Sequence, residues 1–312
     1  MDKNIERIIF MGTPSISAKV LEGLILNGYH IVAVIAQPDR PVGRKKILEP
    51  VPTKVVAEKY NIPVYQPIKI RKEYEFVNEL RPDVIVTLAY GQIVPQGLLD
   101  IPRLGCINLH GSLLPKYRGA APIQYALINN EKKTGMTLMR MVKEMDAGEM
   151  YATEEVEISE EDNATSLFEK MGDAALRLIL RELPKYLEGK LPGVPQDETQ
   201  ATFAPSIKPE EEKIDLIKSK EEIFGLIRGL SEVPGAYLYF DELKLKIYRV
   251  KIVSDENLGD VGEIVRADKG GLYLQTNNGI ISLLDLQLEG KKRMDYRSFI
   301  NGHPQLLHVK LR

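Results

Sequence analysis

Continuous apolar segments alternate with amphipathic ones along the first third of the chain. Arg7–Met11 and Ile31–Ala36 are short apolar runs, which is the pattern of strands buried on both faces. Between them, Ser17–Asn27 carries apolar residues at helical spacing, with Ser15 as a candidate N-cap and Gly28 as a candidate C-cap. The order of these segments predicts a strand–helix–strand unit with parallel strands.

The same alternation continues beyond this first unit. Further strands are expected at residues 63–66, 83–89 and 105–110, and further helices at 73–80 and 164–187. Strands joined by helices in this way are typical of a doubly wound α/β domain with a mostly parallel sheet. The sequence therefore predicts such a domain over residues 1–189.

The pattern changes after residue 189. Residues 190–210 contain four prolines and few apolar side chains, which predicts a linker. Beyond it, a helical pattern is followed by short alternating segments at roughly ten-residue spacing. They are the helix 220–230 and the strands 236–240, 244–252, 262–265, 271–276 and 279–286. This arrangement predicts a small, OB-like β-barrel over residues 211–312.

The composition is that of an ordinary globular protein. Of 312 residues, 44% are hydrophobic and 28% charged, which suits two domains with sizeable cores. Cys106 is the single cysteine, so an intrachain disulfide and a thiolate metal cluster are excluded, and four histidines leave little material for a zinc site. The net charge of −2 means that any nucleic-acid partner would have to be met by local basic patches.

Two further classes of protein do not fit the sequence. The apolar run at 8–11 is too short for a signal peptide, and no run approaches the roughly 18 apolar residues of a membrane span, so we expect a cytoplasmic protein. The turn after the first strand holds one glycine, Gly12, rather than the three of a dinucleotide-binding loop, which argues against a nicotinamide or flavin cofactor.

Candidate chemistry gathers at the end of the strand 105–110. Asn108 and His110 point to the same face of that strand, at the carboxyl edge where open α/β sheets bind ligands. Asp146 lies in a glycine-containing turn between two apolar strand patterns. An amide, an imidazole and a carboxylate that converge can catalyse acyl transfer to an amine. Spacing alone also allows a plain interpretation, in which the pair is a polar strand end and Asp146 a turn-former.

The longer motifs around these residues resemble a known family. Asn108-x-His110 is followed by Ser112–Pro115, then by Tyr117–Gln124 (YRGAAPIQ), and further on by Asp146-Ala147-Gly148. The set is similar to that of the formyltransferases that use 10-formyltetrahydrofolate as co-substrate. The resemblance covers essentially the whole chain and implies a Rossmann-like formyltransferase fold.

The resemblance also implies roles for individual residues. Asn108, His110 and Asp146 would be catalytic, with Asp146 holding His110 and accepting the amine proton. The folate would be bound at two segments: Ala89, Tyr90 and Gly91, and Ser112, Leu113, Leu114 and Pro115. No metal is implied.

Residues 37–46, a basic loop after the second predicted strand, and the C-terminal β domain resemble those of family members that act on charged initiator tRNA. The activity implied is formyl transfer to the α-amino group of initiator methionyl-tRNA, by a monomer that binds neither DNA nor a membrane. Its tRNA contacts would be Arg40, Arg44, Lys45 and Lys46 in the loop and Lys244, Lys246, Arg249, Lys291, Lys292 and Arg293 in the C-terminal domain.

The chain departs from the family at two points. Lys45 stands where many relatives have glycine, and tryptophan is absent, with Tyr125 at one of its usual positions. Other interpretations remain: a folate-dependent formyltransferase acting on a small amine such as glycinamide ribonucleotide or an amino sugar, a formyl-folate hydrolase, or a non-catalytic RNA-binding protein. A solvated surface is also a common role for a basic run such as that in the loop.

Overall fold

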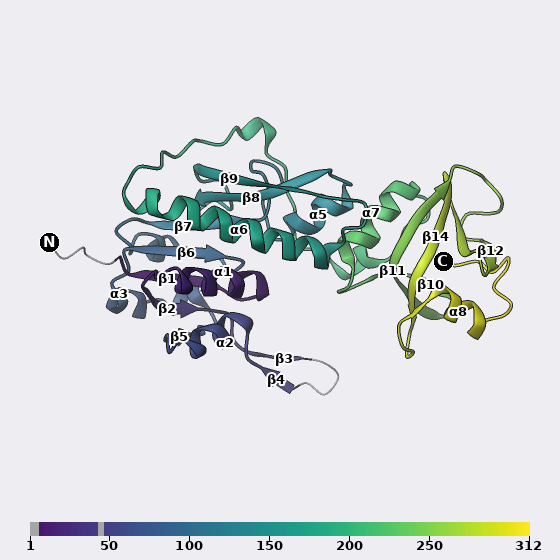
Figure 1. Cartoon of the computed structure of the whole chain (residues 1–312), viewed down its shortest axis with the longest axis horizontal. Coiled ribbons are helices and arrows are strands. Elements are labelled where there is room, and N and C mark those ends of the chain that lie inside the picture. Colours follow the sequence, from purple (N-terminus) through teal and green to yellow (C-terminus); the bar gives the residue numbers. More distant parts are fainter. Residues whose placement is uncertain (1–5, 43–46) are drawn as a thin grey trace. The chain divides into compact units, whose positions relative to one another are not determined.

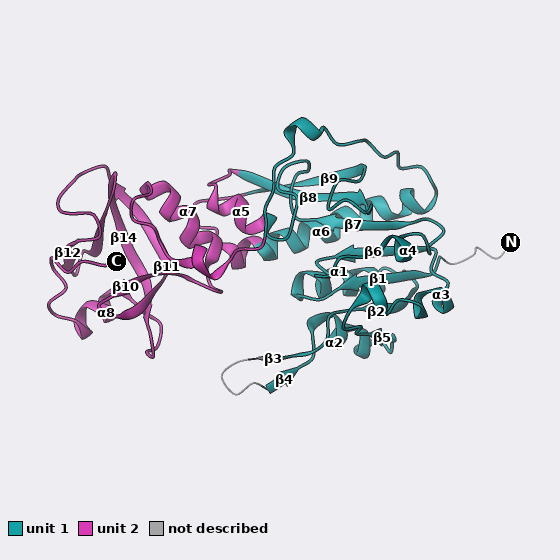
Figure 2. Ribbon diagram, turned by 180° about the vertical axis from the view of Figure 1, so that it is seen from behind, with its two compact units in different colours: residues 1–122, 133–157, 168–205 teal, residues 123–132, 158–167, 206–312 magenta. Residues whose placement is uncertain are grey.

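The computed structural model of the chain describes residues 6–42 and 47–312. They form two units, each built on its own sheet (Figures 1 and 2). Unit 1 contains residues up to 122 together with 133–157 and 168–205, and unit 2 contains 123–132, 158–167 and 206–312. No helix within the described residues is long and apolar enough to cross a membrane.

Unit 1 is built on a seven-stranded sheet in the order β5-β2-β1-β6-β7-β8-β9. The strands are β1 (Ile8–Gly12), β2 (Ile31–Ile35), β5 (Val64–Tyr65), β6 (Val84–Leu88), β7 (Cys106–His110), β8 (Lys133–Arg140) and β9 (Met150–Glu157). The strands from β5 to β7 run parallel, whereas β8 and β9 pair antiparallel at one edge. The prediction of a mostly parallel sheet is confirmed.

The helices of unit 1 cover this sheet. They are α1 (Ser15–Leu26), α2 (Pro52–Lys59), α3 (Phe76–Leu80), α4 (Gln96–Leu99) and α6 (Ala164–Leu187), with 3₁₀ turns at Ile70–Lys72 and Glu198–Gln200. Helices α1 and α6 lie side by side (Figure 1), and Lys19 of α1 forms an ion pair with Asp173 of α6. The sheet core is fully buried, as β1, β6 and most of β2 show.

Two local predictions are wrong. Ser15 is the first residue of α1 rather than its N-cap, because Pro14 takes the extended N-cap conformation and no side chain caps the helix. The helix predicted at 73–80 begins only at Phe76. Glu73 precedes it and instead accepts hydrogen bonds from the backbone N–H groups of Ile68 and Lys69 (3.2 and 3.1 Å), which favours a turn over a helix there.

A two-stranded hairpin follows β2 and was not predicted. Its strands are β3 (Arg40–Val42) and β4 (Ile47–Glu49), paired antiparallel. The predicted tRNA contacts Arg44, Lys45 and Lys46 lie between these strands, outside the described residues.

Asp39 anchors the base of this hairpin. Its carboxylate pairs with Lys54 Nζ (2.6 Å) and accepts from Gln66 Nε2 (2.7 Å) and from the backbone N–H of Val51 (3.2 Å). Burial alone would raise the pKa of Asp39, but these hydrogen bonds outweigh burial and hold that pKa below its usual value. The basic charge of Lys54 is therefore used inside the fold.

Unit 2 is built on an antiparallel sheet in the order β10-β11-β14-β13-β12. Its elements are α5 (Pro122–Ile128), the 3₁₀ turn Pro209–Glu212, α7 (Lys220–Leu230), β10 (Ala236–Phe240), β11 (Leu243–Ser254), β12 (Ile264–Asp268), β13 (Gly271–Thr276), β14 (Gly279–Leu288), β15 (Met294–Asp295) and α8 (Tyr296–Gly302). Buried residues such as Leu238, Ile247, Leu283 and Phe299 fill its interior. A separate, small barrel-like β domain is thus confirmed.

The last residues of the chain bridge the two edge strands of this sheet. Tyr239 of β10 exchanges backbone hydrogen bonds with Arg312 (2.6 and 3.0 Å). Ile264 at the start of β12 donates to Val309 O and accepts from the N–H of His308 (2.9 Å each). The C-terminal segment therefore satisfies backbone groups that β10 and β12 would otherwise leave unpaired.

Candidate active site

His110 ends β7 with its side chain almost fully buried, at 5% exposure. Its Nε2 lies 2.8 Å from the carbonyl oxygen of Tyr117. Because a carbonyl oxygen can only accept, we assign the hydrogen of this bond to Nε2. The other ring nitrogen, Nδ1, faces Asp146 Oδ2 at 3.6 Å. That separation is too long for a direct hydrogen bond.

Asp146 lies in the connection between β8 and β9, in a left-handed backbone conformation with φ of +52°. The backbone N–H of Gly119 donates to its Oδ2 at 2.8 Å. Gly148 completes the tight turn, because a Cβ there would lie 2.0 Å from the carbonyl oxygen of Arg140. The turn therefore aims the carboxylate at the end of β7.

Asn108 lies two residues before His110 on the same strand, so both side chains leave the same face of the sheet. Its side chain is partly exposed. Within residues 6–42 and 47–312, the Asn108 amide has no hydrogen-bond partner. An amide in this position is available to donate to a ligand.

The segment after β7 is fixed by Thr137 of β8. The Thr137 hydroxyl donates to Ser112 O (2.6 Å) and accepts from the backbone N–H of Leu114 (3.2 Å). The Ser112 side chain is fully buried, and its hydroxyl donates to Lys116 O (2.6 Å). Of the predicted folate segment Ser112–Pro115, the Ser112 hydroxyl is thus already used within the protein.

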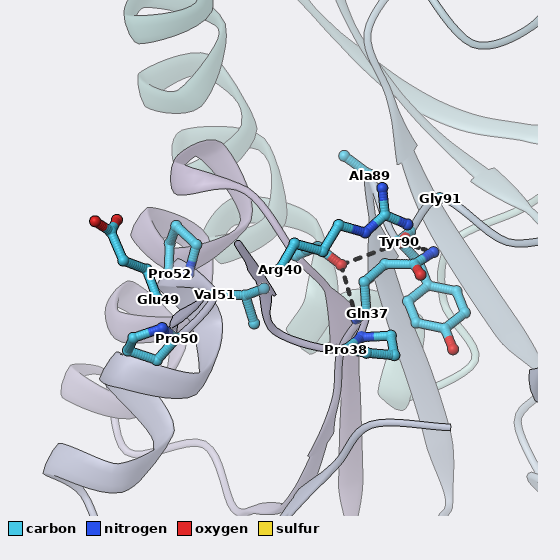
Figure 3. A pocket seen from close by; sticks show the side chains of 11 residues that line it. Gln37, Pro38, Arg40, Glu49, Pro50, Val51, Pro52, Ala89, Tyr90 and Gly91 are labelled. Atoms are coloured by element: carbon cyan, nitrogen blue, oxygen red, sulfur yellow. Dashed lines mark hydrogen bonds between the residues drawn. The ribbon is translucent and has the colours of Figure 1, made fainter. Parts of the chain in front are cut away.

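The predicted folate residues Ala89, Tyr90 and Gly91 line a cavity of about 470 Å³ (Figure 3). Its other lining residues are Thr13, Gln37, Pro38, Arg40, Glu49, Pro50, Val51 and Pro52. In Figure 3, Glu49–Pro52 form one side, Gln37 and Tyr90 the other, and Arg40 extends between them. Residues predicted for two different ligands, the folate and the tRNA, therefore share one cavity.

Hydrogen bonds around Thr13 and Gln37 hold the wall of this cavity. Thr13 Oγ1 donates to Tyr90 O (3.1 Å) and accepts from the N–H of Gln37 (3.1 Å), while Gln37 Nε2 also donates to Tyr90 O (3.2 Å). Burial raises the pKa of the Tyr90 phenol. Its buried hydroxyl has no partner within the described residues. Sequence reasoning gave neither Thr13 nor Gln37 a role.

Cys106 belongs to the core rather than to this site. Cys106 is buried at the start of β7, and burial raises the pKa of its thiol to about 12, so it is a neutral core residue. Among the described residues, no group of three or more His, Cys, Asp or Glu side chains could hold a metal ion.

In unit 2, tyrosines and basic side chains lie together on β10 and β11. Tyr237 and Tyr239 of β10 stand opposite Lys246 and Lys244 of β11. Lys244 Nζ lies 4.3 Å from the ring centroid of Tyr237, and the two tyrosine rings meet edge to face. Lys213 Nζ lies 5.5 Å from the Tyr239 ring. Tyr237 is buried at 8% exposure, so the accessible part of this cluster is Tyr239 with Lys213 and Lys244.

The other basic residues predicted in unit 2 differ in their surroundings. Arg249, Lys291 and Lys292 are exposed, and within the described part of the chain none of them forms a salt bridge. Arg293 instead pairs with Asp285 (2.5 Å) and Glu232 (2.8 Å) and lies over the Tyr248 ring. Hydrogen bonding to Asp285 raises the pKa of the Arg293 guanidinium. The charge of Arg293 is therefore largely neutralised by its neighbours.

Comparison with known proteins assigns the chain to one class. The family model described as "Formyl transferase" matches residues 6–183, and the one described as "Formyl transferase, C-terminal domain" matches residues 206–304. The chain therefore belongs to the formyl transferase family.

Some curated relatives match nearly the whole chain. The methionyl-tRNA formyltransferases of Bacillus cereus (strain B4264) and Bacillus mycoides (strain KBAB4) are each 46% identical to this chain over 308 residues, which is 98% of both sequences. The resemblance inferred from the motifs is confirmed.

Solved structures share the fold at low identity. HypX from Aquifex aeolicus, in complex with tetrahydrofolic acid, is 15% identical to this chain, with a TM-score of 0.68. The match covers 97% of this chain and 48% of the HypX chain. The N-formyltransferase from Helicobacter canadensis, in complex with folinic acid and dTDP-3-aminofucose, is 19% identical to this chain, with a TM-score of 0.68. The match covers 89% of this chain and 98% of the Helicobacter chain.

Proposed function

We propose that Asn108, His110 and Asp146 carry out the reaction of this family in this chain. The protein transfers the formyl group of 10-formyltetrahydrofolate to the α-amino group of initiator methionyl-tRNA. The observation that supports the three residues most directly is the 3.6 Å gap between His110 Nδ1 and Asp146 Oδ2. A single substrate group that bridges these two atoms from one side can contact an acid and a base at once.

The reaction begins when the neutral α-amine attacks the formyl carbon. The carbonyl oxygen becomes an oxyanion, which accepts hydrogen bonds from the Asn108 amide and from His110 Nδ1–H. Because Nε2–H is held by Tyr117 O, His110 donates from Nδ1 only as the imidazolium, whose charge the Asp146 carboxylate stabilises. Asp146 then accepts the amine proton. The oxyanion then re-forms the carbonyl, the C–N bond to the folate breaks, and the folate nitrogen takes up the proton that Asp146 had accepted.

We place the folate against the two predicted segments, 89–91 and 112–115. The segments follow the carboxyl ends of β6 and β7, which are neighbouring parallel strands with Thr87 opposite Asn108. A ligand that spans both ends would bring its formyl group to Asn108 and His110. The backbone N–H groups of 89–91 and the fixed backbone of 112–115 would bind it, since Tyr90 O and the Ser112 hydroxyl are already used within the protein.

The tRNA would be bound at two places, the basic loop and the surface of β10 and β11. Arg40 lines the cavity next to the loop, and Arg44, Lys45 and Lys46 follow it in sequence. On β10 and β11, the partly exposed Tyr239 ring and the lysines near it offer stacking and phosphate contacts together. We further propose that the protein acts as a monomer in the cytoplasm, where charged initiator tRNA is found.

The test is transfer of labelled formyl from 10-formyltetrahydrofolate by the purified protein. We expect formylated methionyl-tRNA as product, with no transfer to glycinamide ribonucleotide and no more release of free formate than in a blank without enzyme. Transfer to the small amine and not to the tRNA would contradict the assignment of the acceptor. Formate release without transfer would indicate a hydrolase.

A further inference from the structure

Two of the candidate catalytic side chains, those of His110 and Asp146, are held by one short turn. His110 donates to the carbonyl of Tyr117, and Asp146 accepts from the N–H of Gly119. The position of this turn therefore sets the distance between the imidazole and the carboxylate. Arg118 lies between its two contact points.

The Arg118 side chain is buried, at 4% exposure, and makes four hydrogen bonds. Its Nε and Nη2 donate to Gln196 Oε1 at 3.1 and 2.8 Å. Its Nη1 and Nη2 donate to the two carboxylate oxygens of Glu198 at 2.9 and 2.7 Å. A planar guanidinium can bind two such acceptors at once, which a lysine cannot do.

Gln196 connects Arg118 to the turn that carries Asp146. Because Gln196 Oε1 accepts from Arg118, its Nε2 is oriented the opposite way, and it donates to Asp146 O (2.7 Å) and Gly148 O (2.8 Å). The side chain is 9% exposed, so its amide is largely shielded from water. These bonds hold Asp146 in its left-handed conformation, at φ of +52°.

Backbone pairing fixes the same turn from a second side. Arg118 N donates to Thr202 O (2.8 Å), and the N–H of Ala204 donates to Arg118 O (2.7 Å). The Thr202 hydroxyl accepts from the N–H of Tyr117 (2.9 Å). Gly119 has φ of +122° and no room for a Cβ, which would lie 2.7 Å from Ala204 O. Gln196, Thr202 and Ala204 thus hold both turns.

We propose that Arg118 and Gln196 are positioning residues, which set the gap between His110 Nδ1 and Asp146 Oδ2 without touching the substrate. The inference rests on the catalytic roles proposed above for His110 and Asp146. Gln196 fixes the backbone of Asp146, Arg118 fixes the orientation of the Gln196 amide, and the peptide groups on either side of Arg118 hold the two catalytic side chains. A small displacement of either turn changes the geometry at the reacting atoms, where rate depends steeply on position.

Gln196→Glu is the most selective test. The substituted carboxylate still accepts from Arg118 but, when ionised, cannot donate to the carbonyls of Asp146 and Gly148. We expect the single-turnover rate to fall at least tenfold and the shape of its pH profile to change, with folate affinity within about twofold of wild type. The matched control is Gln200→Glu, an exposed glutamine of the same segment that bonds to Asp197, which should leave the rate unchanged.

A second variant tests the positioning role in case Gln196→Glu fails to fold. Arg118→Lys keeps the charge but cannot bind Gln196 and Glu198 in two places each, so we expect a smaller loss of rate than for Gln196→Glu, again without loss of folate affinity. An unchanged rate in Gln196→Glu would overturn the proposal. So would a fall in rate that matches the fraction of unfolded protein or that scales the pH profile uniformly.

Parallel measurements separate this inference from the function on which it rests. If Asp146→Asn and His110→Ala lose activity while Gln196→Glu keeps it, only the positioning role fails. If Asp146→Asn and His110→Ala keep their activity, the proposed catalytic roles fail first. Folate binding, followed by fluorescence titration, serves as the common measure of an intact site.

Discussion

The ring of His110 can meet a substrate from one direction only. Its Nε2 is bound to Tyr117 O, and the side chain is 5% exposed, which leaves Nδ1 as the atom that faces Asp146. The ring therefore has a fixed orientation before any ligand arrives, and as the imidazolium it donates from Nδ1. Preorganised donors of this kind stabilise an oxyanion without reorganisation during the reaction.

Removal of either oxyanion donor should slow the chemical step. We expect His110→Ala and Asn108→Ala each to lower kcat by about a hundredfold or more, as the loss of one such donor does elsewhere. Thermal stability should change little for Asn108→Ala, because its amide has no partner within the described residues. Steady-state kinetics with charged tRNA and a melting curve give both quantities. A variant that kept nearly wild-type turnover would remove that residue from the mechanism.

Asp146→Asn tests proton transfer separately from oxyanion binding. The amide keeps the shape of the carboxylate, and its oxygen can still accept from the N–H of Gly119, but it cannot take the amine proton. We expect a large fall in the single-turnover rate with folate affinity mostly retained. Loss of folate binding with intact single-turnover chemistry would contradict the assigned role.

The sequence indicated the side chains of this site better than their supports. Asn108 and His110 share a face because side chains alternate along a strand, and Asp146 stood out as a carboxylate in a glycine-containing turn. The supports at Tyr117 O and Gly119 N are backbone groups, which no residue type announces. Gln196 lies 50 residues beyond Asp146 in a proline-rich segment, so no local pattern connects the two.

At the scale of elements, buried strands and long helices were predicted well, and exposed or irregular elements were not. Helix α6 has the expected bounds, and the apolar runs became β1, β2 and β6, because burial on both faces gives a clear signal. The hairpin of β3 and β4 has three-residue strands, too short to show such a pattern, and β4 is exposed. The pairing of 308–312 with β10 and β12 depends on contacts across as many as 73 residues of sequence, as between Tyr239 and Arg312.

The Asp39 anchor of the hairpin gives a pH-dependent prediction. Because its folded pKa lies below the ordinary value of 3.8, ionised Asp39 stabilises the fold above that pH, and the stabilisation is lost as the pH falls through the folded pKa. We expect Asp39→Asn to lower the free energy of unfolding at neutral pH by about 1–3 kcal/mol.

The pH dependence of this effect is the measurement that checks it. The difference between wild type and Asp39→Asn should be constant above about pH 5 and should shrink below about pH 4, when both side chains are neutral. Urea unfolding at several pH values gives the difference. A constant difference down to the lowest pH would show that the Asp39 charge is not what stabilises the hairpin base.

At the scale of the whole molecule, sequence order and spatial grouping differ. Residues 123–132 and 158–167 belong to unit 2, although both precede the predicted linker. The reason is close packing on α7: a Cβ on Gly225 would lie 2.3 Å from Ile128 O, and Arg228 donates to Ser159 O at 2.8 Å. Boundaries drawn along the sequence cannot separate such segments, because the contacts join residues more than 60 positions apart.

The basic loop should contribute to tRNA binding through charge. We expect the triple variant Arg44→Ala, Lys45→Ala, Lys46→Ala to weaken tRNA binding and to reduce the slope of log affinity against log salt by about 0.7–0.9 for each phosphate that the loop no longer neutralises. Arg44→Ala alone should weaken the free energy of tRNA binding by about 1–3 kcal/mol, because a guanidinium can bind a phosphate or a guanine edge in two places. Folate affinity should not change. If tRNA affinity and its salt dependence stayed unchanged, the loop would be a solvated surface with no part in tRNA binding.

Within unit 2, exposed and paired cations should behave differently toward tRNA. Lys291 and Lys292 are exposed and form no salt bridge within the described residues, so they are free to neutralise phosphates. Lys310 is also exposed, but its Nζ pairs with Asp260 Oδ2 at 2.9 Å. Its charge is therefore already neutralised within the protein. We expect Lys291→Ala with Lys292→Ala to reduce the salt slope of tRNA binding by about 0.7–0.9 for each phosphate left without its lysine, and Lys310→Ala to leave the slope nearly unchanged. Filter binding at three or more salt concentrations measures the slope for wild type and both variants. Equal slopes for wild type and the double variant would place the tRNA elsewhere on the protein.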